Sequence, residues 1–187
     1  NSLGDDTDGR VEDGLVIETS ETIGALRGED GTGVITIDPE QELTVQVEAD
    51  DDGANNATFN GRITGPGSLV KTGAGVLTLD NDNDDSANSS SGVTSETDYT
   101  GETRITAGTL STSGQGIGDT SHVILSGGAM LRLTGDEEIG RLSSAADGSS
   151  TSDNPARIDT AARLITGGID AYTTFAGVIE GPGGVTQ

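Results

Sequence analysis

Carboxylates recur at alternate positions near the middle of the chain. From Asp80 the sequence reads Asp-Asn-Asp-Asn-Asp-Asp, which spaces Asp80, Asp82 and Asp84 two residues apart. Ca²⁺ takes several oxygen ligands, and alternating acidic residues within one loop supply them. The segment is not an EF-hand, because Asp85 and Ser91 stand where that loop needs Gly and Glu. Asp80, Asp82 and Asp84 are therefore a candidate calcium site, and the alternative is a solvated polar loop. The acidic clusters at 5–8 and 50–52 carry the same two interpretations.

Groups that could support catalysis are scarce. The chain has no cysteine, and His122 is its only histidine. A general base or a zinc site needs partners, and His122 directly precedes an apolar run, so we expect it at the surface. The glycine-rich stretches 65–67 and 73–75 lack the Lys-Ser/Thr ending of a phosphate loop and indicate turns. The sequence therefore predicts a protein that is not an enzyme.

The charge balance excludes several kinds of partner. The formal net charge is −23, and Lys71 is the only lysine. Nucleic-acid binding needs a basic stripe, and anionic lipid attracts basic segments, so neither partner is expected. No run of about 18 apolar residues is present, so we expect no membrane insertion of this segment. The dense carboxylates also suggest adaptation to a saline habitat, in which they keep a protein hydrated.

Apolar residues occur in short alternating runs, which are typical of strands. Such runs cover 34–37, 43–47, 76–79 and 130–133, and Gly, Asp and Asn clusters bound them. No segment shows a sustained helical period, and the stretch 161–164 is too short for a helix. The sequence thus predicts an all-β fold with essentially no helix.

The chain also repeats itself at a long interval. Phe59 begins a segment that contains Gly-Pro-Gly, and Phe175 begins a similar segment 116 residues later. Ile23 and Ile139 stand at the same offset within similar hexapeptides. We therefore expect a first repeat unit over 1–116 and a partial second unit over 117–187, in one continuous solenoid, with the natural protein continuing past Gln187.

Small side chains favour a β-solenoid over a β-sandwich. Aromatic residues make up 2% of the chain and glycines number 30 of 187. A sandwich usually has larger core residues, whereas narrow solenoid coils stack small and β-branched side chains. A 116-residue unit at roughly 20–25 residues per coil would advance the axis by about 4.8 Å per coil.

The most specific motif spans 65–110. It reads Gly-Pro-Gly-Ser-Leu-Val-Lys-Thr-Gly-Ala-Gly-Val-Leu-Thr-Leu, then an acidic insertion over 80–98, then Tyr-Thr-Gly-Glu-Thr-Arg-Ile-Thr-Ala-Gly-Thr-Leu. This pattern resembles the autotransporter-associated β-strand repeat of bacterial secreted and surface proteins, although the insertion is longer and more acidic than is typical. The motif has a physical interpretation of its own, in which glycines turn the chain and five apolar side chains point inward as a ladder, namely Leu69, Leu77, Leu79, Ile105 and Leu110.

The resemblance implies a right-handed parallel β-helix, export to the cell surface, and a role in adhesion or in presenting other modules. We therefore expect a structural or adhesive segment of a long bacterial surface or secreted fibre, which associates with other copies of itself end to end or laterally through open strand edges. A calcium-dependent module that binds carbohydrate or another surface is the alternative. A polysaccharide-degrading β-helix enzyme is less favoured, because the arginines are dispersed along the chain and form no basic groove.

Overall fold

The computed structural model describes residues 14–28, 33–49, 56–80, 99–113, 116–167 and 172–187. These residues form strands and turns and contain no helix. The predicted runs at 34–37, 76–79 and 130–133 are strands with those bounds, and the run at 43–47 is a strand shifted by one residue. The all-β prediction is confirmed, and every strand pairing is parallel, which agrees with a β-helix.

Two six-stranded parallel sheets make up most of the structure. We call them sheet II and sheet III, and strands that neighbour each other within a sheet are hydrogen-bonded. Sheet II contains, in spatial order, β2 (Glu21–Ile23), β4 (Glu42–Gln46), β7 (Ser68–Thr72), β9 (Thr103–Ile105), β11 (His122–Leu125) and β14 (Arg141–Ser144). Sheet III contains β5 (Asn56–Phe59), β8 (Val76–Leu79), β10 (Thr109–Thr112), β12 (Met130–Leu133), β15 (Arg157–Thr160) and β17 (Val178–Glu180).

Two three-stranded parallel sheets flank these, one toward each end of the chain. Sheet I contains β1 (Leu15–Ile17), β3 (Val34–Ile37) and β6 (Arg62–Thr64), and sheet IV contains β13 (Glu137–Ile139), β16 (Arg163–Thr166) and β18 (Gly184–Thr186).

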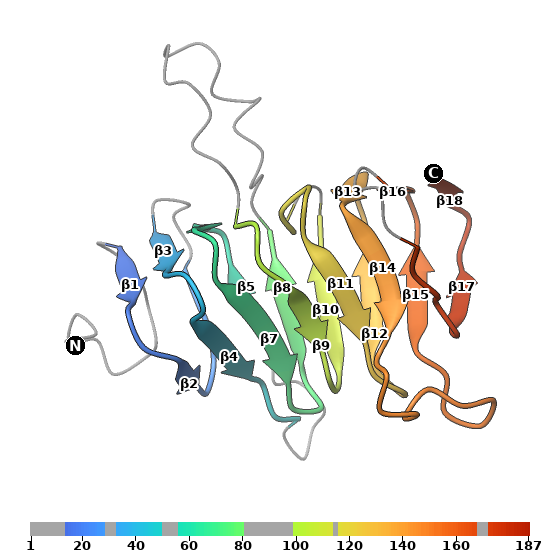
Figure 1. Cartoon of the computed structure of the whole chain (residues 1–187), viewed down its shortest axis with the longest axis horizontal. Coiled ribbons are helices and arrows are strands. Elements are labelled where there is room, and N and C mark those ends of the chain that lie inside the picture. Colours follow the sequence, from blue (N-terminus) through green and yellow to red (C-terminus); the bar gives the residue numbers. More distant parts are fainter. Residues whose placement is uncertain (1–13, 29–32, 50–55, 81–98, 114–115, 168–171) are drawn as a thin grey trace, which may run out of the picture.

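The chain visits the sheets in turn rather than completing one before starting the next. Strands β6, β7 and β8 lie in sheets I, II and III, and strands β13, β14 and β15 lie in sheets IV, II and III. We call one such passage a circuit. The register partners Leu110 and Leu131 are 21 residues apart (131 − 110), within the predicted range for one coil. Figure 1 shows the circuits stacked along the long axis, from β1 near the N-terminus to β17 and β18 near the C-terminus.

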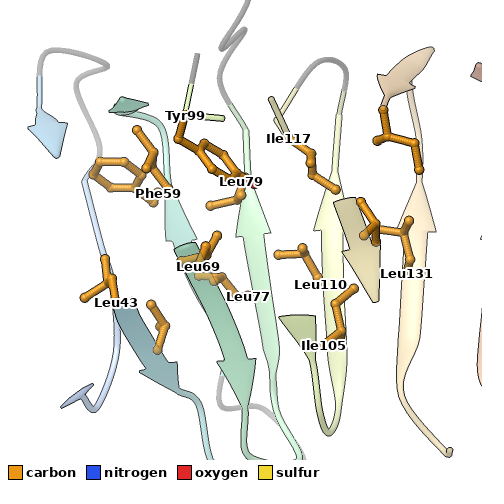
Figure 2. Packing of buried hydrophobic residues seen from close by; sticks show 14 of the residues in the cluster. Leu43, Phe59, Leu69, Leu77, Leu79, Tyr99, Ile105, Leu110, Ile117 and Leu131 are labelled. Carbon is orange, nitrogen blue, oxygen red and sulfur yellow. The ribbon is translucent and has the colours of Figure 1, made fainter. Parts of the chain in front are cut away.

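Inward-facing side chains stack in rows that run from circuit to circuit. In sheet III one row joins register partners in the order Ala57, Leu77, Leu110, Leu131, Ile158 and Ile179. All of these except Ile179 are fully buried. Figure 2 shows members of this row, with Leu69 and Ile105 of sheet II, packed in the interior. The five residues predicted to form the inward ladder are all buried, so that prediction is confirmed.

Glycine is required where the chain turns between β6 and β7. Gly65 has a φ of 98°, and a Cβ there would collide with the carbonyl oxygen of Ile37 in the preceding circuit. Gly181, between β17 and β18, has a φ of 109°, and a Cβ there would collide with the carbonyl oxygen of Thr160. Both glycines precede a Pro-Gly pair. The Gly-Pro-Gly segments that repeat in the sequence therefore have the same local structure.

The segments related by the 116-residue offset nevertheless lie in different sheets. Strand β6 of sheet I corresponds by offset to β17 of sheet III, and β7 of sheet II corresponds to β18 of sheet IV. Strand β2 of sheet II corresponds likewise to β13 of sheet IV. The turn is therefore repeated as a local structure, at different places in the circuit. The division into units at 1–116 and 117–187 stays a prediction.

Candidate functional site

The candidate calcium ligands fall mostly outside the described residues. Asp80 follows β8, is exposed, and donates its backbone N–H to the carbonyl of Phe59 at 3.0 Å. Asp82 and Asp84 lie within 81–98, outside the described part of the chain, as do the acidic clusters at 5–8 and 50–52. The described residues hold no cluster of three or more His, Cys, Asp or Glu side chains that could bind a metal ion. The calcium hypothesis stays a prediction.

The outward face of sheet II carries a row of polar residues. Strand register places His122 beside Arg141, and Glu102, which directly precedes β9, contacts His122 from the other side. Glu42 and Ser68 precede them in the same row. Val123 and Leu125 point into the core, so the alternation of β11 turns His122 outward. We call this set of five residues the outer row.

His122 has two side-chain partners, one on each side. Its Nε2 lies 2.8 Å from the hydroxyl of Ser143 on β14, and its Nδ1 lies 3.6 Å from Oε1 of Glu102. The side chain of His122 is only 17% exposed, which is less than its expected surface position implied. A carboxylate can only accept hydrogen bonds, so the partners favour the tautomer with the proton on Nδ1, whose Nε2 accepts from the Ser143 hydroxyl.

The surroundings keep the imidazole neutral near pH 7. Burial lowers the pKa of His122 from its ordinary value, and the neighbouring Arg141 lowers it further, whereas Glu102 opposes both. A neutral imidazole accepts a proton, so His122 has the form that a general base needs. Nε of Arg141 is buried and, among the described residues, has no hydrogen-bond partner.

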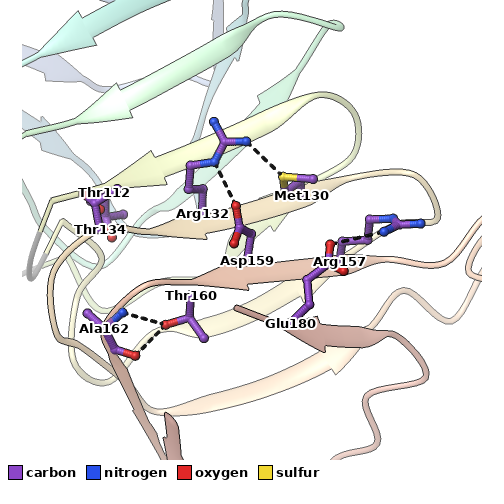
Figure 3. A network of polar contacts seen from close by, with 9 residues as sticks. All are labelled: Thr112, Met130, Arg132, Thr134, Arg157, Asp159, Thr160, Ala162 and Glu180. Atoms are coloured by element: carbon purple, nitrogen blue, oxygen red, sulfur yellow. Dashed lines mark hydrogen bonds and ion pairs between the residues drawn. The ribbon is translucent and has the colours of Figure 1, made fainter. Parts of the chain in front are cut away.

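Arginines elsewhere on the surface pair with acids on other strands. Arg132 on β12 contacts Asp159 on β15 at 3.3 Å, and Arg157 on β15 contacts Glu180 on β17 at 3.2 Å (Figure 3). Arg104 pairs in the same way with Glu42, across the strand between them. These cations are spread over two sheets and are each neutralised by a carboxylate. They therefore do not form the basic groove that an acidic polysaccharide would need.

Lys71 is fully buried, which the charge of its side chain does not predict. On β7 it faces inward with Leu69, and its register partners are Val45 and Ile105 of the inner row. Its ammonium donates to the carbonyls of Thr72, Gly73 and Ala107 at 2.7, 2.8 and 3.2 Å. Burial lowers the pKa of Lys71 to about 8, and Glu48 opposes that shift. Three N–H groups and three carbonyls match in number only while the amine is charged.

Glu137 is the second buried charged group. It lies on β13, and its carboxylate accepts from the backbone N–H groups of Gly116 and Ile117 at 3.2 and 3.1 Å. Burial raises the pKa of Glu137 to about 7, against the opposing effect of these hydrogen bonds. The two amides hold the carboxylate at a turn of the chain, which gives Glu137 a structural role.

Part of these arrangements was detectable in the sequence. Alternation within β7 places Lys71 on the same face of the sheet as Leu69. Alternation within β11 places His122 on the opposite face to Val123. No pattern in the sequence indicated that Ser143 and Glu102 lie beside His122. They meet His122 only through the strand register, and circuit lengths vary too much for the register to be counted from the sequence.

Comparison of the chain with protein-family models, with curated proteins and with solved structures gave no match. Within the described residues, no helix has the length and apolarity needed to cross a membrane. The resemblance to the autotransporter-associated β-strand repeat therefore rests on the motif in the sequence.

Proposed function

We propose that this chain is a segment of a right-handed parallel β-helix and serves as a structural or adhesive repeat of a long bacterial surface or secreted fibre. In this proposal each circuit is one coil, and sheets I and IV are the two ends of a third face. The support comes from the order in which the chain visits the sheets and from the parallel pairing of all strands.

One observation carries the proposal: the inner rows continue from coil to coil up to the last described strands. Ile179 is the register partner of Ile158, and Val185 is the register partner of Leu164, yet the two side chains are 42% and 48% exposed. They continue the inward-facing rows of Ile158 and Leu164, and no described strand packs over them. A stack of this kind is extended by adding further coils, as repeat proteins are.

The surface suits a scaffold better than a basic groove that binds an acidic polysaccharide. Cations are paired across strands, and the net charge is −23, which keeps stacked coils soluble. The mechanical role itself requires no catalysis. The proposed location is extracellular or on the bacterial cell surface, and the proposed partners are other copies of the chain and surface or matrix polysaccharide.

The end of the stack gives a direct test. Strands β17 and β18 form edges of parallel sheets, and unpaired edges next to apolar side chains associate with other chains. We expect sedimentation velocity to show concentration-dependent association of the 187-residue chain. Ile179→Asp should shift the distribution toward monomer, because it places a charge on the contact face.

Val16→Asp is the matched control. Val16 is likewise an exposed β-branched apolar residue on a strand, at 50% exposure, but it points away from the core on β1. This variant should associate as the unmodified chain does. A chain that stays monomeric at every concentration, or two variants with the same effect, would contradict the proposed end-to-end contact.

A further inference from the structure

His122 contacts a serine hydroxyl through one ring nitrogen and a carboxylate through the other. Ser143, His122 and Glu102 form a continuous chain of groups, with the hydroxyl 2.8 Å from Nε2 and the carboxylate 3.6 Å from Nδ1. An activated serine is recognised by this order of nucleophile, base and orienting acid, whatever the fold. Hydrogen bonds in such sites are commonly long before substrate binds. We propose that these three residues form a hydrolytic site for small acyl esters on the outward face of sheet II, an activity beyond the structural role.

The sheet itself positions the three groups. His122 begins β11, Ser143 lies on the neighbouring β14, and Glu102 directly precedes β9 on the other side. Strand pairing fixes His122 opposite Arg141, and Ile124 opposite Ser143, so imidazole and hydroxyl meet diagonally across one pair of strands. The Glu102 backbone N–H donates to the hydroxyl of Ser68 at 3.2 Å, which restrains the residue that carries the acid.

A donor for the developing negative charge lies on the same face. Arg141 precedes Ser143 by two residues on β14, so both side chains point outward. Arg141 is half-buried, and its positive charge acts on the neighbouring imidazole, because it lowers the pKa of His122. A guanidinium N–H beside the nucleophile can stabilise the oxyanion of a tetrahedral intermediate. Arg141 thus completes the groups that acyl transfer requires.

The chemistry balances with water as the only co-reactant. The Ser143 oxygen attacks the ester carbonyl carbon while its proton moves to Nε2 of His122. The tetrahedral intermediate collapses, the C–O bond to the alcohol breaks, and the imidazolium returns the proton to the departing alkoxide. Water then attacks the acyl-serine with His122 as base, which releases the carboxylic acid and restores the serine.

The open setting defines the substrate class. The three residues lie on the outward face of a sheet and not in the interior, and the side chain of Glu102 is 43% exposed. A flat surface encloses no large acyl chain, but it can meet a short acyl group that projects from an extended carrier. The substrate class is therefore a short-chain ester, such as an acetyl group on a hydroxyl of a polymer.

The first experiment uses the whole chain with p-nitrophenyl acetate and with a fluorophosphonate probe. We expect ester hydrolysis and a covalent adduct that mass spectrometry places on Ser143. Ser143→Ala should abolish the adduct and the hydrolysis, and His122→Ala should lower kcat/KM by about 10²–10⁴-fold. Ser126→Ala, at the half-buried serine that directly follows β11, should change neither, and circular dichroism should show that all variants are folded.

The pH profile separates catalysis from a merely structural hydrogen bond. Burial and then Arg141 lower the pKa of His122, and Glu102 opposes them, so kcat/KM should rise with pH through one midpoint below the ordinary 6.5. Glu102→Gln should move that midpoint down, and Arg141→Gln should move it up while also lowering kcat. Equal hydrolysis by the unmodified chain and Ser143→Ala, or an adduct on another residue, would overturn the proposal.

Discussion

The ammonium of Lys71 lies 3.2 Å from the carbonyl oxygen of Ala107, a residue 36 positions later in the next circuit. The same nitrogen also binds the carbonyls of Thr72 and Gly73, which follow it directly. One buried side chain therefore donates hydrogen bonds to carbonyls in both the turn after β7 and the turn after β9. These turns contain Gly73 and Gly108, whose φ values are 77° and 65°. The carbonyl of Thr72 also accepts a hydrogen bond from the backbone N–H of Val47 at 3.0 Å, so the link from Lys71 adds to the backbone pairing there.

Replacing this lysine tests its role as a link between circuits. Lys71→Met keeps most of the side-chain volume and removes all three donors. The carbonyls of Gly73 and Ala107 would lose this donor, so we expect the free energy of unfolding to fall by about 2–4 kcal/mol. Urea denaturation measures the change. Arg132→Met removes an exposed cation and should cost about 1 kcal/mol or less, and an equal loss in the two variants would contradict the role.

Glu137 should make stability depend on pH in the acidic to neutral range. Its folded pKa of about 7 lies above the ordinary 4.5, so the folded state binds the proton more tightly than the unfolded chain does. Its contribution is then fully present below pH 4.5 and is lost as the pH rises through 7. Relative to Glu137→Gln, the unmodified chain should lose up to about 3 kcal/mol between pH 4.5 and 7.5.

Denaturation midpoints measured across that range test this prediction. Glu138→Gln is the matched control, because it makes the same substitution at the neighbouring, half-buried position of β13. A parallel pH dependence of all three proteins would show that Glu137 is not the group responsible.

The glycine turns should tolerate no side chain. Gly65→Ala and Gly181→Ala each place a Cβ against a carbonyl oxygen of the preceding circuit at a positive φ, so each should destabilise the fold by more than about 2 kcal/mol. Gly24→Ala is the control, since a Cβ there meets nothing within 4 Å. Thermal melts should rank the two turn variants together and well below the control. A neutral Gly181→Ala would mean that the two turns are not equivalent.

Salt should stabilise the chain through charge screening. With a net charge of −23, carboxylates repel one another in the compact state, and added ions screen this repulsion. We expect the melting temperature to rise between about 10 mM and 0.5 M NaCl, and to rise equally in KCl. CaCl₂ at matched ionic strength tests the site at Asp80, Asp82 and Asp84. An additional gain that the triple Asp→Asn variant loses would support calcium binding, and indifference to all salts would contradict the screening argument.

Alternation within short runs was enough to predict the strands and the direction of their side chains. Strand β12 and the inward ladder through Leu77 and Leu110 follow from a period of two, because that period depends only on local backbone geometry. The demand for glycine at Gly65 follows in the same way, since only glycine adopts that turn without strain.

Only the tertiary structure decided which residues meet across circuits. Circuit lengths differ, so the sequence leaves the strand register open, and the partners of His122 and the carbonyl of Ala107 beside Lys71 follow from register alone. For the same reason, segments that match at a 116-residue offset have the same turn at Gly65 and Gly181 but lie in different sheets. The sequence determined the local conformation through short-range sterics, and long-range packing of the inner rows determined the place of each strand in the stack.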